Sequence, residues 1–238
     1  MFKKNFKKVL VLALVGLLAL GGTVAYLTDS DTATNKFQVA GQTDDGDNVG
    51  GSVEESKWDD EDDHTIQPNE EMDKNPVVKA GEIDSVVFME LKSPMYEVTA
   101  VADDGTKDAE GAKLQEIFYF KDEADAVGTH ANNFDSNWIL LSEEQKEENG
   151  VTYNVRLFGY GKVLTEEAGE TEALFDKVQL KNILEGEIDA EESDVIVNSY
   201  AIQADNLLDE SGNAIDTSAL DADKLNAIYT IYANQNAE

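Results

Sequence analysis

From His64 onward, apolar and polar residues alternate in short runs that are separated by turn residues. In Ser85–Lys92 the alternating apolar positions share one face of an extended strand: Val87, Met89 and Leu91. Lys177–Lys181 alternates in the same way, and such alternation is typical of half-buried β-strands. Strands at roughly ten-residue spacing predict an all-β domain, a β-sandwich with loop insertions over residues 64–238.

Two local signals add detail to this sandwich. Asn149-Gly150 lies between the apolar runs Trp138–Leu141 and Val151–Phe158, and this dipeptide strongly favours a tight β-hairpin turn. Asp194–Ala204 is apolar at both odd and even positions. Because both faces of such a strand must be buried, we expect it in the middle of a sheet.

One helix is predicted near the C-terminus. Its apolar residues follow the i, i+3, i+4, i+7 spacing of a single helical face: Leu225, Ile228, Tyr229 and Tyr232. Ser218 and Asp221 resemble a capping box at its start. We expect this helix to pack its apolar stripe on the sandwich or across its end.

The first 25 residues have the layout of a secretory signal peptide. A basic start (Lys3, Lys4, Lys7, Lys8) precedes the apolar run Val9–Leu20, and small residues follow at Thr23 and Ala25. This pattern predicts cleavage after Ala25, which would make Tyr26 the new N-terminus. The alternative is an uncut membrane anchor, since Val9–Leu27 carries no charge and approaches the roughly 20 residues that span a bilayer.

The chain is strongly acidic, with 50 acidic residues against 18 basic ones and a net charge of −32. Removing the four leader lysines changes the net charge from −32 to −36. This excludes nucleic acid as a partner, because phosphate binding needs clustered basic residues. The acidity also serves solubility. With no cysteine, the folded state depends on core packing alone.

The segment 42–63 differs in composition from the rest. It is rich in acidic residues, and Lys57 is its single basic residue. Because dense like charges disfavour compaction, we interpret the segment as a solvated linker or loop. Asp44, Asp45 and Asp47 are weak candidates for calcium ligands, because they lack the spacing of an EF-hand loop. Diffuse counterion binding is the alternative, so no tightly bound cofactor is expected.

Several stretches resemble the TasA/camelysin family, the SipW-dependent secreted proteins of Gram-positive bacteria that include a biofilm matrix fibre subunit. The stretch GGTVAYLTDSDTATNKFQVAG resembles the leader and mature start of these proteins. QPNEEMDKNPVVKAGEIDSVVFMELKSP resembles a family block with turns at Pro68-Asn69 and Lys74-Asn75-Pro76 and a long strand ending at Pro94. ALFDKVQLKN and VIVNSYAIQADNL resemble the closing strands. The acidic insert between Gln42 and Asp63 departs from this pattern.

The resemblance implies a jelly-roll-like sandwich that polymerises by donating its mature N-terminal strand to the next subunit. Here the donor strand would be residues 26–41, whose alternating face carries Ala33, Asn35, Phe37 and Val39. Such donation is β-augmentation, in which an extended segment pairs with an open sheet edge. Pairing within its own subunit and disorder are the alternatives for this segment.

Catalytic motifs are scarce in the sequence. His64 and His130 are the two histidines, and neither lies in an H-E-x-x-H pattern. There is no G-x-S-x-G elbow and no thiol nucleophile. We therefore expect no enzyme, but a secreted structural subunit that assembles with itself or a related subunit and meets the membrane only through its leader. The alternatives are a monomeric surface-binding module and a camelysin-like metallopeptidase.

Overall fold

The computed structural model describes residues 28–35, 50–55, 68–126, 128–184, 187–188 and 194–236. Within these residues the chain forms antiparallel sheets and one C-terminal helix, which confirms the all-β prediction at that level. The elements are β1 (Thr28–Asn35), β2 (Gly50–Glu55), β3 (Glu71–Asp73), β4 (Pro76–Ala80), β5 (Ser85–Val98), β6 (Lys113–Glu116), β7 (Phe118–Lys121), β8 (Trp138–Glu148), β9 (Val151–Tyr160), β10 (Lys177–Leu180), β11 (Val195–Gln203) and α2 (Ala222–Asn236).

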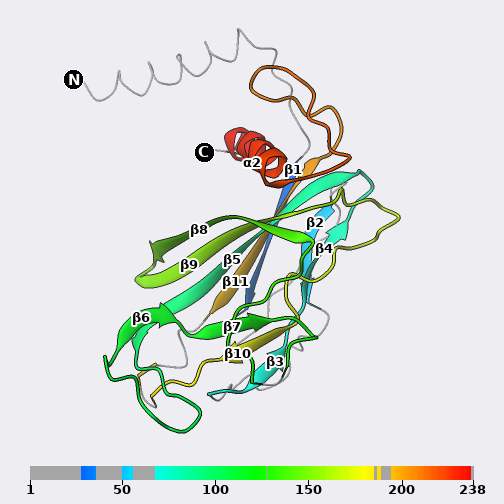
Figure 1. Cartoon of the computed structure of the whole chain (residues 1–238). Helices are drawn as coiled ribbons and strands as arrows, with labels where there is room; N and C mark the ends of the chain where they lie inside the picture. The colour runs from blue at the N-terminus through cyan, green and yellow to red at the C-terminus, as the bar shows by residue number, and fades with distance from the viewer. Residues whose placement is uncertain are drawn as a thin grey trace, which may run out of the picture.

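The largest sheet has the strand order β1-β11-β5-β9-β8, and β6 pairs with the far end of β5. A three-stranded sheet has the order β3-β10-β7, and β2 pairs with β4 in a two-stranded sheet. Figure 1 shows α2 at one end of the largest sheet and β3, β7 and β10 towards the other end. The strands β1 and β11 are therefore neighbours although they lie at opposite ends of the sequence.

Strand β5 is longer than the alternating pattern and the family resemblance suggested, because it continues through Pro94 to Val98. Proline has no backbone N–H, so it is tolerated where a strand has no partner to receive that donor. On one side of β5 the pairing with β11 ends at Lys92 and the pairing with β6 begins at Met95. Pro94 lies between these two partners, and β5 therefore continues past it.

The hairpin predicted at Asn149-Gly150 is present between β8 and β9. Both turn residues have positive φ angles, 53° for Asn149 and 86° for Gly150. Two consecutive positive φ angles define a type I′ turn, whose twist matches that of the flanking strands. Strand β8 runs to Glu148, well past the predicted Trp138–Leu141, and its register shifts between Leu140 and Ser142.

Two hydrophobic clusters lie around the six-stranded sheet. The larger cluster joins residues of β5, β9 and β11 to residues of the two small sheets, including Met89, Phe158, Val197, Val78 and Phe120. The smaller cluster joins Phe88, Leu157 and Ile202 to the helix residues Leu225 and Ile228. Neighbouring positions of β9 and β11 enter different clusters, so both faces of these strands are buried, as predicted for Asp194–Ala204.

Helix α2 packs on the sheet with the predicted apolar stripe, and Leu225, Ile228 and Tyr232 are buried. Its first turn is capped by Asp221, whose Oδ1 accepts a hydrogen bond from the Lys224 N–H at 3.0 Å. Ser218 instead donates its hydroxyl to Asp216. The predicted capping box is thus corrected to a single Asp221 cap.

The N-terminal boundaries fall partly outside the described residues. Within the predicted donor segment 26–41, the structure describes β1. Within the acidic segment 42–63 it describes a strand, β2, where composition suggested a linker or loop. The leader lies outside the described residues. Across the part of the chain that the structure describes, no helix combines the length and hydrophobicity that crossing a membrane requires.

Candidate functional site

The candidate site is the seam between β1 and β11, because β1 is the described part of the predicted donor segment 26–41. The two strands pair antiparallel over the whole of β1, from Thr28 opposite Ile202 to Asn35 opposite Val195. Strand β1 lies at the edge of the six-stranded sheet, and none of the described strands pairs with its outer side. The residues of β1 thus occupy, within their own chain, the edge position that a donated strand would take.

Strand β1 is polar along its length, with the sequence TDSDTATN. Ser30 and Thr32 are exposed, and Ala33 packs against the larger cluster while remaining partly buried. Such a strand buries little apolar surface, so backbone hydrogen bonds to β11 supply most of its attachment. Any copy of β1 offers the same backbone groups.

Strand β11 differs sharply from β1, because Val195, Val197, Ala201 and Ile202 are fully buried. If β1 were removed, the backbone N–H and C=O groups of this apolar strand would form an open edge. Open apolar edges are templates for pairing with another chain. Strand β1 of the same chain therefore covers an edge of β11 that would otherwise be open.

Strand β2 forms a second seam, with β4. Val53 pairs with Val78, and both side chains are buried in the larger cluster. At the end of β2, the Glu55 carboxylate lies 3.2 Å from the Lys74 ammonium, and both side chains are buried, with 8% and 1% of their surface exposed. Removing either partner of a buried ion pair leaves an unpaired buried charge and destabilises the fold. The charges at these two positions must therefore be opposite.

A side chain connects the two seams. The Asp31 carboxylate of β1 accepts a hydrogen bond from the backbone N–H of Val53 in β2, at 3.2 Å. Since Asp31 is opposite Ser199 of β11, this contact links the edge of the six-stranded sheet to the two-stranded sheet. The two N-terminal strands are therefore joined to each other as well as to the rest of the chain.

The C-terminal end of α2 contacts the beginning of β1. The Thr28 hydroxyl donates to the Asn236 side-chain oxygen at 3.3 Å and accepts from the Gln235 amide at 3.4 Å. Burial raises the pKa of the Tyr232 phenol, while a hydrogen bond with Ser30 of β1 acts in the opposite direction. The two hydrogen bonds of Thr28 are long and exposed, so they contribute little to the stability with which β1 is bound.

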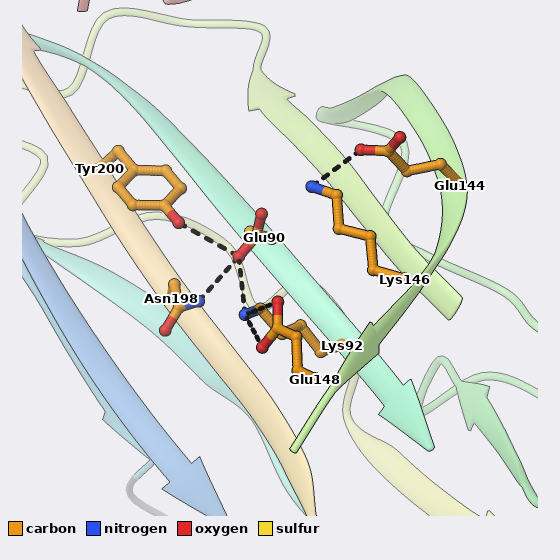
Figure 2. A network of polar contacts seen from close by, with 7 residues as sticks. All are labelled: Glu90, Lys92, Glu144, Lys146, Glu148, Asn198 and Tyr200. Atoms are coloured by element: carbon orange, nitrogen blue, oxygen red, sulfur yellow. Dashed lines mark hydrogen bonds and ion pairs between the residues drawn. The ribbon is translucent and has the colours of Figure 1, made fainter. Parts of the chain in front are cut away.

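A polar network connects β11 to β5, its neighbour on the side away from β1. Figure 2 shows Glu90 of β5 with its Oε1 atom accepting from the Asn198 amide at 2.8 Å and from the Tyr200 hydroxyl at 3.2 Å. The network continues through Lys92 to Glu148 of β8. Burial and the Glu90 charge raise the pKa of Tyr200 well above its usual range. Asn198 and Tyr200 lie opposite the β1 residues Thr32 and Ser30, so the network stabilises the strand that receives β1.

The residues that sequence reasoning singled out are only partly brought into this site. Ala33 and Asn35 lie on β1, opposite Val197 and Val195. The other predicted positions lie outside the described residues, namely the cleavage residues Thr23, Ala25 and Tyr26, the strand residues Phe37 and Val39, and the calcium candidates Asp44, Asp45 and Asp47.

The described residues contain no group of three or more His, Cys, Asp or Glu side chains arranged to hold a metal ion. His130 stacks its ring on Tyr119, with the ring centroids 5.8 Å apart. His64 lies outside the described residues. The contacts of His130 are those of a surface loop residue.

Sequence reasoning missed Asp31, Glu55, Lys74 and Glu90. In the sequence Glu55 belongs to an acidic run and Lys74 to a turn motif. Their roles depend on partners distant in the sequence, so no local pattern marks them. The buried position of Lys74 is the one feature that would single it out, and burial becomes visible only in the fold.

Comparison of the chain with protein-family models, with curated proteins and with solved structures finds no match.

Proposed function

We propose that this chain is an exported structural subunit that assembles into extracellular fibres or a matrix layer by exchanging β1 between copies. In the assembled form, β1 of one copy pairs with β11 of the next and makes the same contacts that it makes within its own chain. The partner is a second copy of this chain or a related secreted subunit. No catalysis is part of the proposal.

The single observation that carries this proposal is the contrast between the two strands of the seam. Strand β11 is apolar and buried, and it requires a covering strand. Strand β1 is polar and attaches mainly through its backbone, so releasing it from its own chain exposes little apolar surface. A domain swap forms the same contacts between copies that were present within one copy. The exchange therefore costs little free energy.

The opposite edge of the six-stranded sheet supports a directional mode of association. Strand β8 carries four glutamates and one lysine between positions 143 and 148 and is largely exposed there. Charges on an edge strand oppose pairing with another chain. Association is therefore favoured at β11 once β1 has left that edge, and it is disfavoured at β8.

Three further parts of the proposal come from the sequence. The leader directs export with cleavage after Ala25, the fold is a jelly-roll-like sandwich, and the chain is a relative of the TasA/camelysin proteins. The antiparallel sheets on both sides of the larger cluster are compatible with such a sandwich. The protein would then act outside the cell, in a matrix or at the surface.

A monomeric surface-binding module is the second candidate function. The observation in its favour is that β1 is fully paired with β11 of its own chain, as a self-contained module requires. The two candidates place the same strand in the same position and differ in which copy supplies it.

The experiment that separates them is negative-stain microscopy of the exported protein across a range of salt concentrations. Subunits of charge −36 repel one another, and the screening length falls from about 30 Å at 0.01 M salt to about 10 Å at 0.1 M. Fibres are expected to grow faster at the higher salt, in millimolar calcium or near the sequence pI of 4.1. Protein that stays monomeric at high salt and high concentration would favour the binding module.

A further inference from the structure

We propose that the element exchanged between copies is a two-stranded N-terminal arm, β1 together with β2, and that the buried Glu55–Lys74 ion pair selects the copy that receives it. This inference rests on the proposed function, because it concerns the same exchange. We define the body as residues 68–236. The receiving surface is then made by two strands of the body, β11 for β1 and β4 for β2.

Strand β2 has the same relation to the body as β1. Each lies at the edge of its sheet, and among the described strands each pairs with a single strand of the body. Both precede the body in the sequence, so one crossover between Glu55 and Pro68 suffices to transfer them together. The residues 56–67 reach at most about 40 Å when fully extended, which is enough to pass from one small domain to a neighbour.

The bond between Asp31 and Val53 favours movement of both strands as a unit. If β1 left for another copy while β2 stayed, the Asp31 carboxylate would lose the Val53 N–H at 3.2 Å. A charge-assisted hydrogen bond that is partly buried is costly to leave unmade. Transfer of the whole arm carries this bond along unchanged.

Strand β2 also provides the specificity that β1 lacks. The attachment of β1 is mainly through its backbone, which pairs with many open sheet edges. Val53, 4% exposed, adds an apolar contact, and Glu55, whose carboxylate pairs with the buried Lys74 ammonium, adds a charge that only a matching body accepts. An unmatched buried charge is strongly unfavourable, so this pair rejects wrong partners as well as attracting the right one.

A charge-exchange experiment on the full-length exported protein tests this inference. In Glu55→Lys protein, the arm and the body both carry lysine at the pair, and in Lys74→Glu protein both carry glutamate. Each variant alone is expected to assemble more than about tenfold more slowly than the wild type, because every contact is mismatched. A mixture of the two variants is expected to assemble at nearly the wild-type rate, because alternating copies restore the pair between chains.

The Glu54–Lys79 ion pair, between β2 and β4, provides an exposed control, and Lys79 also contacts Glu170 at 2.5 Å. The Glu54 and Lys79 side chains are 51% and 36% exposed, and their charged atoms lie 3.2 Å apart. Because exposed ion pairs contribute little stability, Glu54→Lys and Lys79→Glu should each assemble much as the wild type does. The double variant Glu55→Lys with Lys74→Glu controls for folding and should also assemble alone.

The outcomes distinguish the inference from the function on which it rests. Wild-type protein that forms no assemblies overturns the proposed function itself. Wild-type protein that assembles, with a mixture that stays as slow as the single variants, overturns the two-stranded arm and leaves β1 as the exchanged element. Single variants that assemble at the wild-type rate likewise overturn the role of the ion pair.

Discussion

The carboxylate of Asp31 accepts a hydrogen bond from the backbone N–H of Val53 at 3.2 Å. This contact joins two strands that belong to different sheets and that both precede the body in the sequence. It makes the N-terminal arm a connected unit, although each strand pairs separately with the body.

Replacing Asp31 with alanine should lower the free energy of unfolding by about 1–2 kcal/mol, because the Val53 N–H loses a charged acceptor. Urea denaturation followed by circular dichroism measures this change. Asp29→Ala is the matched control, since Asp29 lies on the same strand and its removal changes the net charge equally. Asp29 and Asp31 each also accept a hydrogen bond from the next backbone N–H, so an equal loss in both variants would contradict a specific contribution of the Asp31–Val53 contact.

Gly159 of β9 provides the space into which α2 packs. A Cβ atom at this position would lie 3.0 Å from both terminal carbons of Leu225 and 3.2 Å from one of Leu141. Gly159→Ala is therefore expected to cost about 1–3 kcal/mol of stability through overpacking. In a Leu225→Ala background the same change should cost clearly less, and full additivity in this double-mutant cycle would contradict the proposed crowding.

Burial, with smaller contributions from Glu90 and Tyr232, raises the pKa of Tyr229 to about 12. The unfolded chain releases this proton near pH 10, whereas the folded chain retains it. The free energy of unfolding is therefore unaffected by this proton below pH 10 and falls as the pH rises from 10 to 12. The free energy of unfolding of the wild type should therefore fall relative to that of Tyr229→Phe over this range, and a difference that does not change with pH would refute the assignment.

Export should release a chain that begins at Tyr26, because small residues at Thr23 and Ala25 follow a short apolar run. Intact-mass analysis of the exported protein checks this cleavage. A mass that retains residues 1–25 would instead support a membrane anchor.

Local sequence was sufficient where a few adjacent residues determine the structure. Asn149-Gly150 adopts the two positive φ angles that its turn requires, and the apolar stripe of α2 follows from helical spacing. The central position of β11 follows from its apolar residues at both odd and even positions. These features depend on backbone preference and on the need to bury apolar side chains.

Features that depend on distant partners could not be predicted. Glu55 and Lys74 form a pair only because β2 lies beside β4, and Glu90 contacts Asn198 across 108 residues of sequence. Strand β2 lies within an acidic segment whose composition predicts a loop. It forms a strand because it pairs with β4, which is distant in the sequence. Pairing between strands is set by the whole fold, so a local pattern does not contain it.

The most direct measurement of strand exchange uses the absence of native cysteine. Thr32 of β1 lies opposite Asn198 of β11, and directly opposed residues of antiparallel strands are close enough for a disulfide. A protein with Thr32→Cys and Asn198→Cys would be assembled under reducing conditions, collected by centrifugation, oxidised and separated by denaturing electrophoresis without reductant. A Glu147→Cys and Thr152→Cys pair, between β8 and β9, serves as the control that should cross-link only within one chain. We predict a ladder of covalent multimers for the β1–β11 pair, because each β1 is held by the β11 of a neighbour, whereas cross-linked single chains in the assembled fraction would contradict strand exchange.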